Sequence, residues 1–269
     1  LMLALAVAAV AGADIRAVTP VPQNADTNSW WMKRHAQKLE RVKAGGSRVV
    51  FIGDSITHFW EGNGRVQWEK YFAGAPYHAL NLGYSADRTE HVLWRLDHGE
   101  LDGYEAKAVV LMIGTNNTGH WPFEKEPPAD TIIGVRAGLD KIRAKQPSAK
   151  IVLCPIFIFP RGATPQDSCR VRNDVVNREI RKFADGKAVL WCDFTARFLA
   201  LALDELDALH AENGDKDIDS DLFLERMPAK APSVTDKTFN FYFQSMPAPD
   251  HASMMACQKR LDHLAKPLY

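Results

Sequence analysis

The chain lacks an excess of charge of either sign. Its 269 residues include 33 Lys+Arg and 33 Asp+Glu, which gives a formal net charge of zero. Proteins that bind nucleic acid usually carry a basic face, so this balance argues against a nucleic-acid partner and favours a small or neutral ligand. No predicted strand is followed by G-x-G-x-x-G or G-x-x-x-x-G-K-[ST], which disfavours a nucleotide enzyme.

Cysteine is scarce, and its spacing excludes two kinds of site. The four cysteines, Cys154, Cys169, Cys192 and Cys257, form no C-x-x-C pair and have no histidine at metal-binding spacing. We therefore expect no metal and no redox cofactor. Cys154 and Cys192 fall in apolar runs and are interpreted as buried thiols.

The chain also lacks an apolar run long enough to span a bilayer. The run Leu1–Val10 is too short, and Ala11-Gly12-Ala13 follows it as a small-x-small cleavage pattern. Residues 1–13 are interpreted as the remnant of a signal peptide, which predicts an exported protein, periplasmic or secreted, with no integral membrane segment in the mature chain. A buried N-terminal strand or helix is the alternative.

The remainder predicts a linker and helix over residues 14–46 and one domain over residues 47–269. Thr27–Ala44 has the pattern of an amphipathic helix. Short apolar runs then alternate with helix-like segments, which indicates a parallel sheet covered on both faces. The segment near 201–244 is acidic and then aromatic, as in a long insertion or lid. The runs are Arg48–Ile52, Tyr77–Leu82, Ala108–Ile113, Ile151–Pro155 and Ala188–Trp191, and the helix-like segments are Val66–Phe72, Arg88–Leu96, Pro128–Lys145, Cys169–Ala184 and Ala252–Leu264.

Residues that can carry chemistry follow the first three runs, where the site of such a sheet is expected. The first run leads into Gly53-Asp54-Ser55-Ile56-Thr57, the second ends at Asn81-Leu82-Gly83, and the third leads into Gly114-Thr115-Asn116-Asn117. The N–H groups of Ser55 and Gly83 and the Asn116 amide could bind an oxyanion. Each residue could instead be a helix cap or a turn former.

These three blocks, in this order and spacing, resemble those of the SGNH (GDSL-like) hydrolases. The stretches from His78 to Leu101 and from Val110 to Asn117 resemble the catalytic subunits of platelet-activating-factor acetylhydrolase, and the likeness extends over Arg48 to about Leu199. The resemblance implies a three-layer α/β/α sandwich with five parallel strands in the order 2-1-3-4-5, a flavodoxin-like arrangement, and metal-free ester hydrolysis.

The resemblance also implies roles for residues. Ser55 would be the nucleophile, and Ser55, Gly83 and Asn116 would form the oxyanion hole. Asp54, Asn117 and His120 are expected to contact the substrate.

A serine nucleophile needs a base, and His251 is the candidate because the family's histidine opens the last helix. The family usually has an aspartate three residues earlier, but this chain has Ala248 there, with Asp250 next to the histidine. Three interpretations are open: Asp250 serves as the partner through a shifted backbone, a backbone carbonyl orients His251 in a Ser-His dyad, or the site is impaired. Phe241–Met246 resembles a protease-tag site, which leaves the origin of that stretch open.

The expected function is hydrolysis of short acyl esters, chiefly acetyl esters of carbohydrates. The alternatives are a lipid esterase acting on lysophospholipids or on platelet-activating-factor-like lipids, and a catalytically impaired glycan-binding protein with the same fold. Whether the chain is a monomer or a homodimer stays open.

Overall fold

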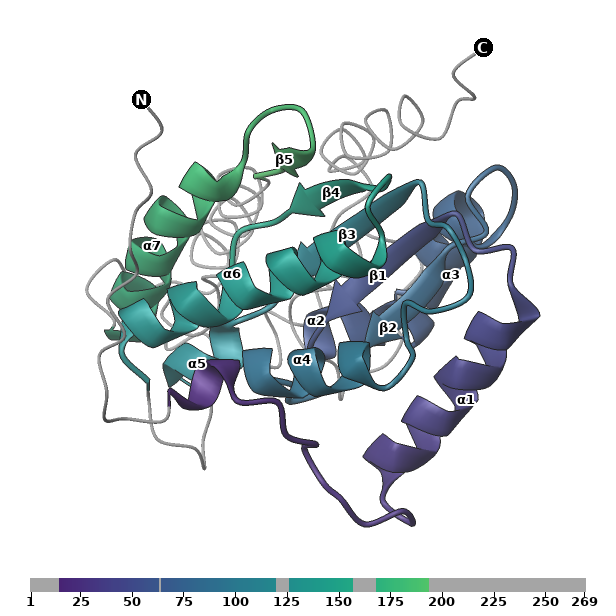
Figure 1. Cartoon of the computed structure of the whole chain (residues 1–269), viewed down its shortest axis with the longest axis horizontal. Coiled ribbons are helices and arrows are strands. Elements are labelled where there is room, and N and C mark those ends of the chain that lie inside the picture. Colours follow the sequence, from purple (N-terminus) through teal and green to yellow (C-terminus); the bar gives the residue numbers. More distant parts are fainter. Residues whose placement is uncertain (1–14, 63, 120–125, 157–167, 194–269) are drawn as a thin grey trace, which may run out of the picture.

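The computed structural model describes residues 15–62, 64–119, 126–156 and 168–193 (Figure 1). Five parallel strands form one sheet in the order β2-β1-β3-β4-β5, which confirms the predicted fold class. Each of the five strands overlaps one of the five apolar runs of the sequence. Their bounds are β1 Val49–Gly53, β2 Leu80–Gly83, β3 Ala108–Met112, β4 Lys150–Leu153 and β5 Val189–Trp191.

Helices connect the strands, as parallel pairing requires. The longer ones are α1 Trp30–Ala44, α4 Thr89–Asp97, α6 Pro128–Lys145 and α7 Ser168–Ile180. The shorter ones are α2 Ser55–His58, α3 Arg65–Trp68 and α5 Thr115–Gly119, together with single turns at Arg16–Val18, Phe59–Glu61, Glu69–Ala73 and Arg181–Phe183.

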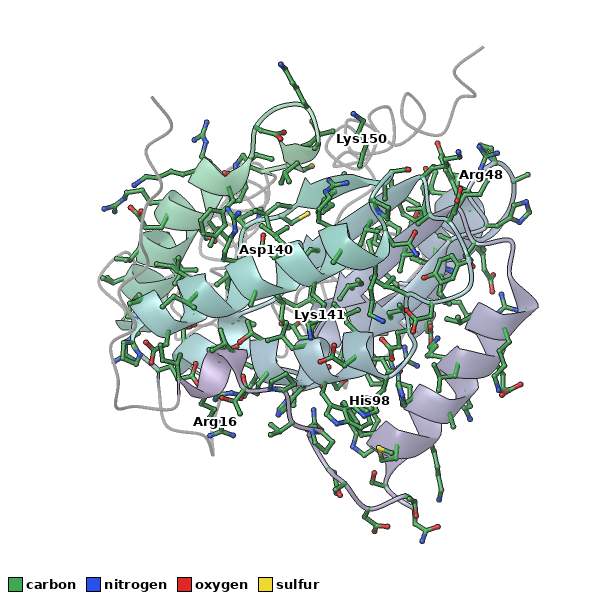
Figure 2. All side chains as sticks on the ribbon, in the orientation of Figure 1. Arg16, Arg48, His98, Asp140, Lys141 and Lys150 are labelled. Carbon is green, nitrogen blue, oxygen red and sulfur yellow. The ribbon has the colours of Figure 1, made fainter. Side chains whose placement is uncertain are left out.

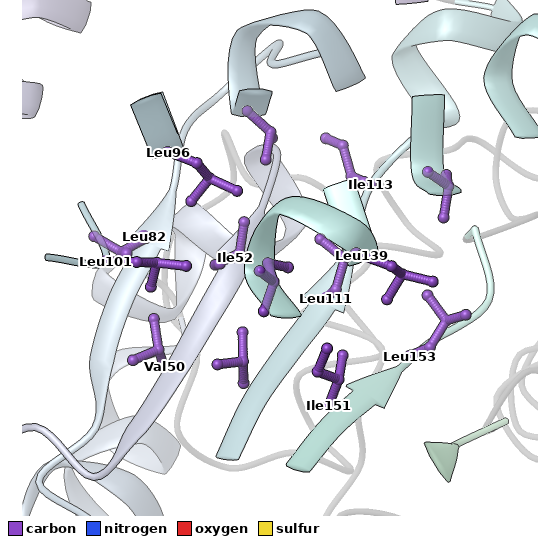
Figure 3. Packing of buried hydrophobic residues seen from close by; sticks show 14 of the residues in the cluster. Val50, Ile52, Leu82, Leu96, Leu101, Leu111, Ile113, Leu139, Ile151 and Leu153 are labelled. Atoms are coloured by element: carbon purple, nitrogen blue, oxygen red, sulfur yellow. The ribbon is translucent and has the colours of Figure 1, made fainter. Parts of the chain in front are cut away.

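One face of the sheet carries the main hydrophobic core, because alternate strand residues point to it. Figure 3 shows these side chains meeting Leu96 of α4 and Leu139 of α6. Val176 and Ile180 of α7 belong to the same buried cluster. The strand residues of this core are Val50, Ile52, Leu80, Leu82, Val109, Leu111, Ile151 and Leu153.

Aromatic packing covers the other face beside β1. The Phe51 ring lies 5.1 Å from that of Trp68 in α3 and 5.0 Å from that of Phe72 in the following turn. The segment predicted as a helix over 66–72 is helical from Arg65 to Ala73, as α3 followed directly by a π-helical turn, and both parts face Phe51.

Helix α1 packs beside β2 and α4 (Figure 1). It begins at Trp30 rather than at Thr27 because the Ser29 side chain accepts a hydrogen bond from the Met32 N–H, which caps the helix. Its buried residues, Trp31, Arg34, His35, Lys38 and Val42, form one stripe along the helix.

Other predicted segments differ from the structure or lie outside the described residues. Strand β2 begins at Leu80 instead of Tyr77 because His78 has a positive φ of 44°, which is incompatible with extended backbone. The leader 1–13, the insertion 201–244 and the helix Ala252–Leu264 lie outside the described residues. Within the described part, no helix is both long and apolar enough to cross a membrane.

Leu111 tests how strongly the central core stabilises the fold. Its side chain is fully buried in the middle strand, so Leu111→Ala should lower the free energy of unfolding by about 2–5 kcal/mol. Urea denaturation measures this. Val66→Ala, at an exposed position of α3, is the control and should stay within about 0.5 kcal/mol of wild type. Equal effects of the two substitutions would contradict the assigned core.

Candidate active site

The carboxyl ends of β1, β2 and β3 lie side by side. Gly53 pairs with Gly83 on β2 and with Met112 on β3. A Cβ on Gly53 would lie 2.2 Å from Thr57 Oγ1 and 2.6 Å from the Met112 carbonyl oxygen. The close packing that glycine permits brings together the segments that follow these strands.

Ser55 is the first residue of α2 and is partly exposed. Asp54 precedes it, and its Oδ1 accepts a hydrogen bond of 2.9 Å from the Ile56 N–H. Asp54 was expected to contact substrate, but it is only 1% exposed and caps the helix. It orients the turn that presents Ser55, and substrate contact is no longer its expected role.

Gly83 occupies a position that only glycine fits. A Cβ there would lie 2.2 Å from the His58 nitrogen and 2.4 Å from the Thr57 carbonyl carbon. The Gly83 N–H, expected to bind an oxyanion, instead donates to Asn81 Oδ1 at 2.8 Å. This hydrogen bond engages the proton that the oxyanion role requires.

The turn between β2 and α4 holds a residue that the sequence did not single out. Ala86 has a φ of 62°, a left-handed conformation that is uncommon for residues with a side chain. The turn is fixed at both ends, since Tyr84 N–H donates to the Gly53 carbonyl and Asp87 N–H to the Tyr84 carbonyl, each at 3.1 Å. Strained residues often mark functional sites. Alanine gives no sequence signal for this conformation, as a glycine would have done.

Asn116 lies in α5, directly after β3, and is 1% exposed. Its side-chain Nδ2 donates to the Asp87 carbonyl oxygen at 2.7 Å, and its own carbonyl accepts from Arg88 Nη1 at 3.2 Å. Two successive residues of the β2–α4 turn therefore hold both the side chain and the backbone of Asn116, as expected for a pre-positioned amide donor.

Asn117, expected to contact substrate, is fully buried between the turn that follows β2 and the segment that follows β3. Its Oδ1 accepts from the Thr89 N–H at 3.1 Å, and its Nδ2 donates to Glu126 at 2.9 Å and to the Thr89 hydroxyl at 3.0 Å. Glu126 also pairs with the buried Arg88 guanidinium. The structure thus replaces the expected substrate contact with a structural one.

The predicted base His251 and its neighbour Asp250 lie outside the described residues. The same holds for three other histidines, His120, His210 and His263. The dyad and triad hypotheses for His251 therefore stay predictions.

The described histidines differ in their distance from the carboxyl edge. His78 precedes β2, and His98 caps the C-terminal end of α4 (Figure 2), so both lie toward the amino edge of the sheet. His35 and His91 are buried and bonded within the fold. His58, three residues after Ser55 in α2, lies on the same helical face as Ser55.

His58 forms part of the rim beside Ser55. Its Nδ1 lies 3.0 Å from Ser85 Oγ, and its ring stacks on the exposed indole of Trp30 at 5.9 Å. Burial and then the positive charge of Arg34 lower the pKa of His58 to about 4. Its imidazole is therefore neutral at physiological pH and can accept or donate a hydrogen bond.

The described part of the chain contains no group of three or more His, Cys, Asp or Glu side chains placed to bind a metal ion. Cys154 is buried, as predicted, and Cys192 is partly exposed; neither is disulfide-bonded.

His91 should make stability depend on pH. Burial and then Arg88 lower the pKa of His91 to about 3, against about 6.5 in the unfolded chain. Between these values the unfolded state binds more protons, so the free energy of unfolding falls as pH drops from about 6.5 toward 3, by up to about 1.4 kcal/mol per pH unit.

The variant His91→Gln removes the titrating group but keeps an acceptor for the Arg88 N–H, which His91 Nδ1 now accepts at 3.1 Å. Urea denaturation at pH 7, 6 and 5 should show a shallower loss of stability in the variant. Identical slopes in both proteins would contradict the buried, neutral state of His91.

Comparison with known proteins agrees with this architecture. Residues 51–218 match the model of the GDSL-like Lipase/Acylhydrolase family. The chain is 34% identical over 174 residues to human platelet-activating factor acetylhydrolase IB subunit alpha1, covering 64% of this chain and 69% of that protein. It is 36% identical over 168 residues to the platelet-activating factor acetylhydrolase IB subunit beta homolog of Drosophila melanogaster, covering 62% of this chain and 68% of that protein.

A solved structure shares the fold. The acetyl xylan esterase AlAXEase superposes with a TM-score of 0.54 at 18% identity, covering 78% of this chain and 98% of that one. At this identity the likeness concerns the arrangement of the chain alone.

Proposed function

The chain belongs to the GDSL-like lipase/acylhydrolase family, and from this premise we propose that it hydrolyses short acyl esters, chiefly acetyl esters of carbohydrates, through Ser55. The observation that carries the proposal is the fixed Asn116 amide. Asp87 holds that amide at 2.7 Å, at the strand end beside the one that presents Ser55. A nucleophile and a rigid donor at adjoining strand ends suit acyl transfer.

In the proposed mechanism the Ser55 hydroxyl oxygen attacks the ester carbonyl while His251 takes the hydroxyl proton. The tetrahedral intermediate collapses, His251 protonates the leaving alkoxide, and the alcohol departs from the acyl-Ser55 enzyme. Water then attacks the acyl group, again through His251, and releases the acid. Asp250 is the proposed partner of His251, with a backbone carbonyl as the alternative because Ala248 occupies the family's usual position.

Three donors are proposed for the oxyanion: the N–H groups of Ser55 and Ala86 and the second side-chain N–H of Asn116. Ala86 replaces Gly83 in this assignment because the Gly83 N–H is donated to Asn81, whereas within the described residues the Ala86 N–H donates no hydrogen bond. Its left-handed backbone would be part of the same arrangement.

The names of the relatives support an acetyl group as the acyl part, and Trp30 supports a sugar as the alcohol part. The Trp30 indole is 47% exposed and stacks on His58 at 5.9 Å. A flat, accessible aromatic face with polar neighbours suits the ring of a pyranose. A lipid ester is the second candidate, since the relatives are named for platelet-activating factor.

Export is proposed together with this function, from the signal-peptide interpretation of residues 1–13. Secreted material that retains Leu1 at its N-terminus would contradict the signal-peptide interpretation. The division into a linker and helix over 14–46 and a hydrolase domain over 47–269 is proposed from the pattern of apolar runs and helix-like segments in the sequence.

Ser55→Ala and Asn116→Ala test the proposed machinery. Ser55→Ala should abolish hydrolysis of p-nitrophenyl acetate and labelling by a fluorophosphonate. Asn116→Ala should lower kcat by about 10²–10³ with little change in KM, because the amide binds charge that develops only in the transition state.

Mass spectrometry of the labelled protein locates the fluorophosphonate, which should be found on Ser55. Label on another residue would contradict the assignment of the nucleophile. A folded wild type without turnover or label would favour the impaired, glycan-binding alternative.

Trp30→Ala tests the nature of the alcohol. It should raise the KM for an acetylated methyl xyloside by about ten-fold, which corresponds to the loss of one aromatic contact, and raise the KM for ethyl acetate much less. Trp30→Phe should restore most of the affinity, and Ile133→Ala, at an exposed site on α6, is the control. Equal changes for both esters would count against a sugar-binding face.

A further inference from the structure

Residues 15–46 precede the stretch that matches the family model, which begins at residue 51. They nevertheless reach the turn that holds Asn116. Gln23 donates through Nε2 to two groups of that turn, the Ser85 carbonyl at 2.9 Å and Asp87 Oδ1 at 3.0 Å. One side chain thus bridges the residues on both sides of the left-handed Ala86.

Trp31 of α1 makes the second contact. Its indole Nε1 donates to Asp87 Oδ1 at 2.7 Å, and the side chain is fully buried. The indole also packs against Tyr84 at 5.7 Å, at the start of the same turn. The same carboxylate oxygen, Asp87 Oδ1, therefore accepts hydrogen bonds from both Gln23 and Trp31, which lie in two separate parts of the N-terminal segment.

The other carboxylate oxygen is held from α4. Asp87 Oδ2 pairs with Arg95 Nε at 2.8 Å, and Arg95 in turn pairs with the buried Glu100. Glu100 is bound to the segment as well, since His35 Nδ1 lies 3.0 Å from it. Burial raises the pKa of Asp87 to about 7, while Arg95 and Trp31 act to lower it. These donors therefore favour the ionised carboxylate.

Each hydrogen bond to the carboxylate restrains the backbone of the same residue, and the Asp87 carbonyl is the acceptor that fixes Asn116. We propose that residues 15–46 are a working part of the catalytic unit, in which Gln23 and Trp31 are positioning residues that hold the Asn116 amide through Asp87. The inference rests on the proposed function of Asn116. A displacement of about 1 Å in a catalytic group can lower a rate by about 100-fold.

Gln23→Ala in the full chain tests the proposal with little risk to folding, because Gln23 is only partly buried. It should lower kcat for p-nitrophenyl acetate by about ten-fold with KM changed by less than two-fold, as expected for a shift of an oxyanion donor. The rate is expressed per active site titrated with the fluorophosphonate, so that a smaller folded fraction alone would not change it. Gln37→Ala, at an exposed site on α1, is the matched control and should equal wild type.

Trp31→Phe is the second variant, since it keeps an aromatic ring at this buried position and removes the indole N–H together with part of the ring. It should lower kcat in the same manner. Unchanged kcat per titrated site in both variants would overturn the proposal, as would equal losses in the Gln37→Ala control.

A measurement without turnover separates this inference from the proposed function. The side-chain amide resonances of Asn116, assigned with Asn116→Asp, should shift in Gln23→Ala and stay in place in Gln37→Ala. Unshifted resonances in Gln23→Ala would overturn the positioning role even if the enzyme is active. If the wild type hydrolyses no ester and Gln23→Ala still shifts the Asn116 resonances, the result would support the coupling and reject the esterase.

Discussion

The close approach of three strand ends is the constraint on which the site depends. Gly53 meets Gly83 on one side and Met112 on the other, at separations that leave no room for a Cβ. This register fixes where the helix bearing Ser55 starts and how near the β2–α4 turn and α5 come to it. A larger residue at either glycine would push the backbone apart and separate the nucleophile from the proposed oxyanion donors.

Buried polar groups then join the two loops that follow β2 and β3. A buried charge is tolerated when it is paired and hydrogen-bonded. Asp87 and Arg88 meet this condition, and they hold the side chain and the backbone carbonyl of Asn116. Such pairs contribute little net stability compared with apolar packing. Their value here is geometric, because they restrict the loops to one arrangement. The N-terminal segment takes part through its contacts with Asp87, although it lies outside the family match.

The residues of the site fall into two groups, those at the strand ends and those at the rim. Ser55 and Asn116 lie at strand ends, where the register of the strands leaves little freedom. Trp30 and His58 lie further out, stacked and partly exposed, where a substitution changes the surface without disturbing the sheet. Under the proposed function, the rim residues Trp30 and His58 would therefore discriminate between a sugar and a lipid alcohol. The reaction at Ser55 and Asn116 would be the same for both.

By itself, the sequence determined the parallel α/β architecture, because buried strands are continuous apolar runs, and it located Ser55 and Asn116, because polar residues after such runs share one edge of the sheet. Only the tertiary structure decided how these residues are used. In the structure Asp54 caps α2, and Asn117 joins the loops that follow β2 and β3. The Gly83 N–H donates to Asn81. Gln23 and Trp31 donate hydrogen bonds to Asp87. The reason is physical: composition and periodicity specify which residues are buried and on which element they lie. Hydrogen-bond partners more than fifty residues apart, and a left-handed alanine, are set by packing between elements.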